Sequence, residues 1–207
     1  TLGKDWGLNY GVTYTTALDN SYQMYYDPET EAPLPDNNMK SRRREQTVNF
    51  YAGLSKSFGE KLSADVSLAA EQYHTDMWNE WSLYPVANLT YLPAPGHILQ
   101  FSLSSDKEYP EYWSMQNSTS YMGAYSEIQG NPFLKPATNY ETTLSYILKG
   151  KYVLSAYYSR TKNKEMQTLY QSPERLVEIY KCFNFDFSEQ AGLVMVVPFK
   201  VKKWLDS

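Results

Sequence analysis

Few residues of the sequence carry the chemistry of catalysis or metal binding. The chain holds two histidines, His74 and His97, and one cysteine, Cys182. One cysteine excludes a disulfide framework and a multi-cysteine zinc site, and two histidines leave little for histidine-based metal or triad chemistry. Asp76 lies two residues after His74, and carboxylates gather in the stretch 27–36, but neither group has the ligand spacing of a known metal loop. We therefore expect no catalytic residue, no metal site and no cofactor.

Aromatic side chains are the second group with binding chemistry. The chain contains 5 Trp, 20 Tyr and 8 Phe, which together make up 16% of its residues. Rings stack on sugars and other flat ligands, and loops often carry ligand-binding residues. Five rings fall in one polar stretch: Tyr109, Tyr112, Trp113, Tyr121 and Tyr125. Two interpretations stay open, a ligand-binding platform or a loop whose rings pack on one another as a cover.

The elements that must position these rings are β-strands. Apolar and polar residues alternate with a period of two in five segments, and alternate residues of a strand point to opposite faces of its sheet. Helical spacing is never sustained over three turns. The alternation and the turn residues predict eight strands, at residues 4–16, 46–56, 62–74, 84–92, 98–105, 138–149, 151–170 and 176–199.

The connections between these strands differ in length. Tight turns are expected at 57–61, 93–97 and 149–151, and longer polar connections at 17–45, 75–83 and 106–137. Outer-membrane β-barrels have short periplasmic turns at one end and longer extracellular loops at the other. Most of the predicted strands also reach the ~9–11 residues that cross a bilayer at a tilt. The sequence therefore predicts an all-β, antiparallel up-and-down meander that forms part of a large outer-membrane β-barrel.

The two faces of the predicted strands agree with this fold. One face carries Leu, Val, Ala, Phe and Tyr, and the other is largely Gly, Asn, Ser, Thr and Gln. A soluble sandwich places charge on its outer face, whereas small uncharged polar residues suit the wet interior of a large barrel. Tyrosines near strand ends suit the aromatic girdles of such barrels: Tyr14, Tyr73, Tyr84, Tyr91, Tyr140 and Tyr152.

One motif resembles a known family. The run Gly130-Asn-Pro-Phe-Leu-Lys-Pro136, followed by Tyr140-Glu141 and an alternating strand, resembles the Gly-Asn-Pro-x-Leu-Lys-Pro…Glu segment of TonB-dependent outer-membrane receptors and of the related outer membrane protein β-barrel family. Upstream, Tyr109 replaces the arginine of the family's Arg-Pro-x-Tyr, and residues 198–204 resemble its turn into a further strand. The matching motif positions are Gly130, Asn131, Pro132, Leu134, Lys135, Pro136 and Glu141.

The resemblance implies a location and a role. Receptors of this kind have a barrel of about 22 strands, an N-terminal plug and a segment that contacts an energy-coupling protein. We therefore expect residues 1–207 to be one segment of about eight strands, truncated at both ends, in the cell outer membrane. The implied role is nutrient uptake or ligand binding at the cell surface, without catalysis, with outer-membrane lipid as a partner and an energy-coupling protein reached through parts outside this chain. The isolated segment is expected to remain open and to self-associate through its strand edges.

A basic cluster precedes the second predicted strand. Arg42, Arg43 and Arg44 form the only such run in the sequence. Where a strand enters the outer leaflet, arginines can contact the phosphates of lipopolysaccharide. The alternative is a solvated loop base, with Glu45 beside it. A nucleic-acid surface is not expected, because the formal net charge of the chain is −4.

A soluble fold is the competing interpretation. The mean hydropathy of −0.58 suits a soluble β-sandwich that binds carbohydrate through exposed Tyr and Trp. The alternation of long and short connections and the uncharged polar faces favour the barrel segment.

Overall fold

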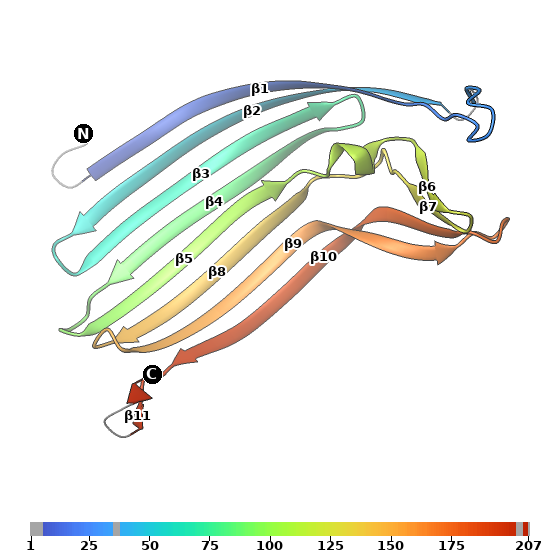
Figure 1. The fold of residues 1–207 in the computed structure, drawn as a ribbon. Coiled ribbons are helices and arrows are strands. Elements are labelled where there is room, and N and C mark those ends of the chain that lie inside the picture. The colour runs from blue at the N-terminus through green and yellow to red at the C-terminus, as the bar shows by residue number, and fades with distance from the viewer. Residues whose placement is uncertain (1–5, 35–37, 202–204, 207) are drawn as a thin grey trace.

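The structure is a computed structural model that describes residues 6–34, 38–201 and 205–206. Ten strands form one curved sheet (Figure 1). Their bounds are β1 Trp6–Gln23, β2 Met39–Phe58, β3 Leu62–Thr75, β4 Asn79–Tyr91, β5 His97–Glu108, β6 Thr119–Gly123, β7 Ser126–Gln129, β8 Ala137–Leu148, β9 Tyr152–Gln171 and β10 Glu178–Val196. A 3-10 helix, η2, spans Tyr112–Met115, and the short strands β11 (Lys200–Val201) and β12 (Leu205–Asp206) pair with each other.

The eight predicted strands are confirmed as β1 to β5 and β8 to β10. They follow one another in the sheet in chain order, and each pairs antiparallel with the next. The sheet order is β1-β2-β3-β4-β5-β8-β9-β10-β7-β6. The pairing of β7 with β10 is parallel, so the meander predicted as wholly antiparallel is antiparallel except for these four residue pairs.

The first long connection is much shorter than predicted. The stretch 17–45 was expected to be loop, but β1 continues to Gln23 and β2 begins at Met39, so that only 24–38 lies between them. The reason is that every residue from Ala17 to Gln23 pairs with a residue of β2. This pairing supplies the backbone hydrogen bonds that a loop would make with water. Pro35 and Asp36 of this connection lie outside the described residues. Similarly, β4 begins at Asn79 rather than at residue 84.

The second long connection is an ordered unit. Between β5 and β8 the chain forms η2 and the β6–β7 hairpin, and β7 adds to the sheet beside β10. Buried apolar side chains of Met115, Leu134 and Cys182 form a small cluster beneath this unit. The sequence does not show this arrangement, because the pairing of β7 with β10 joins residues about fifty positions apart.

The tight turns gather at one end of the sheet. Gly59, Gly96 and Gly150 occupy them with φ of +61°, +77° and +63°, the left-handed region that glycine enters without steric cost. Figure 1 shows these turns together at the lower left. At the opposite end lie the connections 24–38, 109–136 and 172–177 and also the short turn 76–78, which was predicted as a longer connection at 75–83. By the rule for outer-membrane barrels, the short-turn end is periplasmic and the long-connection end is extracellular.

The pairing register places the apolar side chains on one continuous face. Residues that are directly opposite in a ladder lie on the same side of the sheet. Leu8 is opposite Leu54, and the row continues through Val66, Ala87 and Leu103. This face is solvent-accessible: Leu8 is 50% exposed, and Leu193 and Met195 on β10 are 76% and 69% exposed. A soluble sandwich would bury such a face, whereas a barrel turns it to lipid.

The sheet is open. Among the described residues, β1 pairs only with β2, and no ladder joins it to β10. The expectation that eight strands of this chain do not close into a small barrel is therefore confirmed for the described residues. No helix in the described part of the chain is long and apolar enough to span a bilayer.

Candidate functional site

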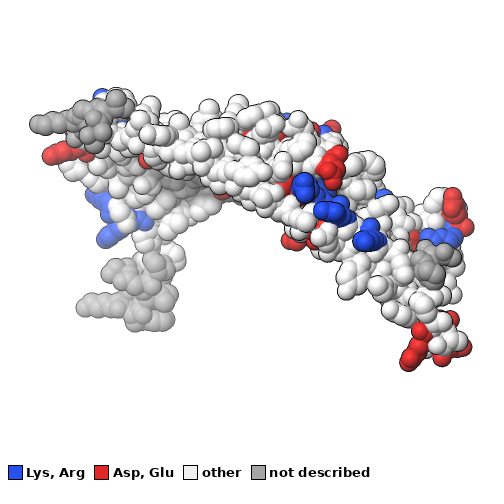
Figure 2. All heavy atoms as spheres, turned by 90° about the horizontal axis from the view of Figure 1, so that it is seen from above, with Lys and Arg blue, Asp and Glu red and all other residues white. Residues whose placement is uncertain are grey.

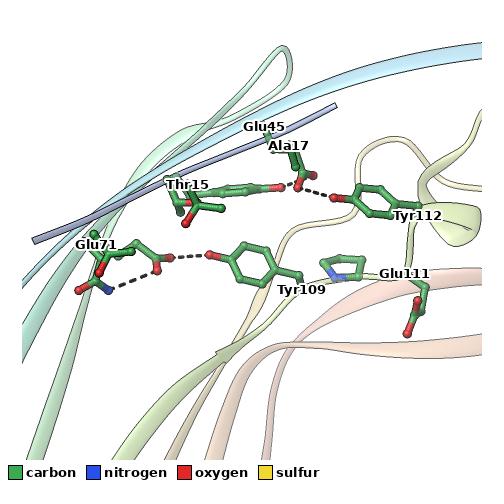
Figure 3. Close-up of a pocket in the computed structure, with 12 residues that line it drawn as sticks. Thr15, Ala17, Glu45, Glu71, Tyr109, Glu111 and Tyr112 are labelled. Carbon is green, nitrogen blue, oxygen red and sulfur yellow. Dashed lines mark hydrogen bonds between the residues drawn. The ribbon is translucent and has the colours of Figure 1, made fainter. Parts of the chain in front are cut away.

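A cavity lies on the polar face of the sheet near the long-connection end. The chain that follows β5 turns back over β1, β2 and β3 and encloses about 610 Å³ (Figure 3). Small hydroxyl residues, carboxylates and tyrosines line it: Thr13, Thr15, Ala17, Glu45, Thr47, Asn49, Glu71, Tyr73, Tyr109, Pro110, Glu111 and Tyr112. The odd-numbered residues of β1, β2 and β3 supply the wall because strand alternation turns them all to this face.

Two tyrosines tether the returning segment to the wall. The hydroxyl of Tyr109 donates a hydrogen bond to Glu71 Oε1 at 2.7 Å, and the hydroxyl of Tyr112 donates to Glu45 Oε2 at 3.1 Å. Figure 3 shows both rings pointing to the strands, whereas Glu111 points away from Glu45 and Glu71. The segment is thus fixed at two points rather than resting on the sheet through apolar contact.

The carboxylates of Glu45 and Glu71 are each also paired with a cationic side chain. Arg43 Nε lies 2.8 Å from Glu45 Oε1, and Lys107 Nζ lies 3.0 Å from Glu71 Oε1. The two carboxylate side chains are only 14% and 13% exposed. A carboxylate held out of water is strongly destabilising unless it is paired and hydrogen-bonded. These cations therefore let two acidic groups lie inside the cavity wall as charge-neutral pairs.

Tyr73 connects the two pairs. Its hydroxyl donates to Glu45 at 2.8 Å and accepts from Arg43 at 3.2 Å, while its ring lies 5.1 Å from that of Tyr109 and 4.6 Å from Lys107 Nζ. The pairing of β4 with β5 ends at Leu103, so Lys107 and Tyr109 reach Glu71 across the place where that ladder stops. The result is one network of rings and charges from β2, β3 and β5.

The tyrosines of the returning segment stay protonated. Burial, and secondly the hydrogen bond to Glu71, raise the pKa of Tyr109 well above its ordinary value. Burial and the charge of Glu45 likewise raise the pKa of Tyr112. Both phenols are therefore hydrogen-bond donors at neutral pH.

The other three candidate rings lie outside the cavity lining. Trp113 in η2 is 50% exposed, and Tyr125 at the β6–β7 turn is 65% exposed. Tyr121 packs edge-on against Tyr25 with ring centroids 5.9 Å apart. The structure thus divides the five predicted aromatics into two that line the cavity and three that do not.

The family motif holds the connection in place. Asn131 Nδ2 donates to the carbonyl of Cys182 at 2.9 Å, and Leu134 is completely buried. The backbone NH of Lys135 donates to Asn184 Oδ1 at 2.7 Å, and Asn184 Nδ2 returns a bond to the Lys135 carbonyl at 2.9 Å. These contacts fasten the chain before β8 to β10, which is a structural role.

The remaining motif positions support the same role. Gly130 lies against the backbone carbonyl of Gln116, where a Cβ has no room. Pro136 is buried and Pro132 is half-buried. Glu141 is exposed on β8, opposite Ser104. None of the seven motif residues lines the cavity.

The three arginines do not share a face. Arg43 points into the cavity wall and pairs with Glu45, whereas Arg42 and Arg44 are exposed on the opposite side of β2. Figure 2, viewed from above, shows basic side chains on the surface with acidic side chains beside them, next to a broad region without charged side chains. The interpretation of all three as one lipid contact does not fit Arg43.

Sequence reasoning missed the charged part of the wall. Glu45, Glu71 and Lys107 lie in or beside strands whose polar faces were described as mostly uncharged. The available signal was that Glu71 and Tyr73 occupy odd positions of the predicted strand 62–74, in line with its polar residues. Glu45 was assigned to the predicted connection 17–45 and gave no such signal. Their meeting with Tyr109 and Tyr112 depends on the chain reversal after β5, which no local pattern shows.

The fold and the wall define a segment of an outer-membrane β-barrel, with an apolar outer face and a polar inner face that carries a loop-covered cavity. The chain belongs to the outer membrane protein beta-barrel family, whose sequence model matches residues 1–207. The family resemblance and the outer-membrane location predicted from the sequence are therefore confirmed. No match to a curated protein sequence was found.

Solved structures with the same fold are receptors. A mutant of the ferric enterobactin receptor PfeA from Pseudomonas aeruginosa superposes with a TM-score of 0.63 at 17% identity, over 96% of this chain and 31% of that one. The siderophore receptor PirA from the same organism gives 0.63 at 12% identity, over 95% and 38%. A double mutant of the Serratia marcescens hemophore receptor HasR, in complex with hemophore and heme, gives 0.60 at 9% identity, over 94% and 38%. The chain spans about a third of the length of these receptors.

Proposed function

We propose that this chain forms part of the wall and the cell-surface end of an outer-membrane receptor that takes up a nutrient, and that its cavity contacts the ligand on the way in. The observation that carries this proposal is the cavity of about 610 Å³ on the polar face, at the long-connection end, with Tyr109 and Tyr112 in its lining. No catalytic step is assigned to these residues.

The lining favours an organic ligand with hydroxyl or carbonyl groups. Glu45 and Glu71 are already paired with Arg43 and Lys107, so these strands offer mainly ring faces and threonine and tyrosine hydroxyls. Glu111 is the one further carboxylate of the lining. Tyrosine combines a large apolar face with one hydrogen-bonding group, which suits such ligands. The similar receptors are named for ferric enterobactin, a siderophore, and a hemophore with heme, which gives the first compounds to test.

Two partner proposals accompany this role. An energy-coupling protein acts on the receptor through regions outside residues 1–207. The isolated segment self-associates, because β1 presents an unpaired edge along its described length and unpaired edges recruit other chains. Sedimentation of the segment in detergent-free buffer tests the second proposal, which a monodisperse monomer would contradict.

The uptake proposal is tested on the full-length receptor in outer-membrane vesicles. Ferric enterobactin and heme serve as probes, and binding is measured for the wild type and for Tyr112→Ala, Tyr109→Ala and Tyr121→Ala. We expect the first two variants to bind the recognised probe at least about tenfold more weakly, since each removes a ring and a hydrogen bond from the lining. Tyr121 lies outside the lining and is the matched control. Equal affinity in all four proteins would contradict the proposal, and binding of neither probe by the wild type would exclude both compounds.

A further inference from the structure

The β1–β2 hairpin extends beyond the rest of the sheet. The ladder between β2 and β3 ends at Glu45, whereas β1 and β2 remain paired as far as Gln23 and Met39. The last six residue pairs therefore form a two-stranded ribbon. Strand alternation divides its side chains between two faces. Lys40, Arg42 and Arg44 share one face, and they are opposite Tyr22, Asn20 and Leu18 of β1 respectively.

Contacts with the second long connection show which face is the inner one. Gln116 Nε2 donates to Ser21 Oγ at 2.7 Å, and the hydroxyl of Tyr25 donates to the carbonyl of Thr119 at 2.6 Å. Ser21 lies on this inner side, as does Arg43, the ion-pair partner of the cavity residue Glu45. The face with Lys40, Arg42 and Arg44 consequently points outward, and Tyr22 beside them is 74% exposed.

The basic row lies just beyond the apolar belt. At the short-turn end, Lys56 Nζ lies 4.2 Å from the ring centroid of Trp6, a pair typical of a membrane–water interface. An apolar band about 25 Å tall, crossed at a tilt of about 45° with a rise of about 3.4 Å per residue, takes roughly ten residues. Counted from Trp6, the band ends near Thr16, which pairs with Gln46. On the same face of β2, the next residue toward the extracellular end is Arg44. It therefore lies at the height of the lipid headgroups.

The row places three positively charged side chains on one face of the ribbon. Successive members are two strand residues apart, which is about 7 Å. Asp19 is opposite Arg43 and so lies on the inner face. The ion pairs found within the described part of the chain do not involve Lys40, Arg42 or Arg44.

We propose that Lys40, Arg42 and Arg44 bind the phosphate groups of lipopolysaccharide in the outer leaflet. The guanidinium fork of arginine matches phosphate oxygens in a bidentate manner, and a lysine ammonium adds a point charge. Leu18, which is opposite Arg44, is 49% exposed and can pack on the lipid below the headgroup. The site is separate from the cavity, because the sheet lies between them.

The test uses the full-length protein in detergent, with rough lipopolysaccharide titrated in and its affinity measured by the shift in unfolding temperature. The triple variant K40Q/R42Q/R44Q is compared with K61Q/K149Q/K151Q, which loses the same charge from exposed lysines at the short-turn end. Since each basic residue near a lipid surface contributes about a fivefold factor, we expect roughly 100-fold weaker binding for the first variant, which loses three. The second variant should match the wild type.

Two further measurements use only the wild-type protein, so they do not require any variant to fold. They distinguish binding of lipopolysaccharide phosphates from binding of free phosphate. Enzymatically dephosphorylated lipopolysaccharide should bind the wild-type protein much more weakly than the intact lipid. Inorganic phosphate at the same concentration should give no shift. The proposal is overturned by equal affinity of the two triple variants, by equal binding of the dephosphorylated lipid, or by an equal shift with inorganic phosphate.

Discussion

Tyr109 and Glu71 meet across the place where β4 and β5 stop pairing. The phenol donates to Glu71 Oε1 at 2.7 Å, and the same oxygen lies 3.0 Å from Lys107 Nζ. Glu71 Oε1 on β3 thus binds both Lys107, near the end of β5, and Tyr109, the first aromatic residue after β5. This contact helps to fix one side of the cavity lining, because residues 109–112 run between the hydrogen bond to Glu71 and the hydrogen bond to Glu45.

Removing the Tyr109 hydroxyl should weaken the attachment of residues 109–112 to β3. Tyr109→Phe keeps the ring but leaves Glu71 with only Lys107 and Asn49 as partners. A hydrogen bond to a charged group contributes about 1.5–3 kcal/mol when buried, and Tyr109 is 41% exposed, so we expect a loss of about 1 kcal/mol. Urea unfolding of the full-length protein in lipid vesicles measures it. Tyr125→Phe, at a ring that is 65% exposed, is the control, and an equal loss there would contradict the assigned tether.

The same tether predicts a pH dependence. The pKa of Tyr109 is raised in the folded state above the value of about 10 expected in the unfolded chain. Its stabilising contribution is therefore complete below about pH 10 and falls as the pH rises through the folded-state pKa. The stability difference between wild type and Tyr109→Phe should be constant from about pH 7 to 9 and shrink above about pH 10. A difference that already declines near neutral pH would show that another group titrates.

Gly130 should be intolerant of a side chain. A Cβ at this position would overlap the carbonyl oxygen of Gln116, whereas a Cβ at Gly123 meets nothing within 4 Å. Gly130→Ala is expected to cost about 1–3 kcal/mol, since the obstructing atom is backbone. The connection should also become easier to cleave with protease. Gly123→Ala is the control. A Gly130→Ala protein that resists protease as well as the control would refute the close approach.

The strand framework could be predicted from the sequence because its cause is local. Leu62, Ala64, Val66 and Leu68 alternate with small or polar residues, and this period of two is visible without any knowledge of the neighbours. The stretch 17–45 was misassigned because its polar residues resemble loop composition. Their strand conformation results from pairing between β1 and β2 beyond the lipid belt, where the outer face need not be apolar.

The candidate site could be predicted only in part. Tyr109 and Tyr112 stood out because rings in a polar loop suggest binding, and both line the cavity. Trp113, Tyr121 and Tyr125 gave the same signal and lie elsewhere, because the path of the connection depends on η2 and on the addition of β7 to β10. Composition cannot specify such a path. The motif around Asn131 identified the family, but its residues form structural contacts with β10 and do not line the cavity.

The two faces of β3 should respond oppositely to charge. Leu68 is opposite Ala52 on the apolar face, and Ser67 is opposite Gly53 on the polar face. Leu68→Arg in the full-length protein should cost about 2–4 kcal/mol, because an arginine near the bilayer midplane is costly. Ser67→Arg should cost much less, and Phe101→Arg with Ser102→Arg forms a second matched pair. Refolding into lipid vesicles gives the free energies, and equal costs within each pair would contradict the facing.

Spin labelling along β1 tests the central claim most directly, namely that this sheet is a barrel wall with lipid on one side and water on the other. Single cysteines at Leu8, Asn9, Val12 and Thr13 are labelled in the full-length protein carrying Cys182→Ser, in lipid vesicles. Their collision rates with oxygen and with a water-soluble nickel complex are then compared. The account predicts that labels at Leu8 and Val12 favour oxygen, which concentrates in lipid, and that labels at Asn9 and Thr13 favour the nickel complex. Uniform accessibility, or the reverse alternation, would contradict it.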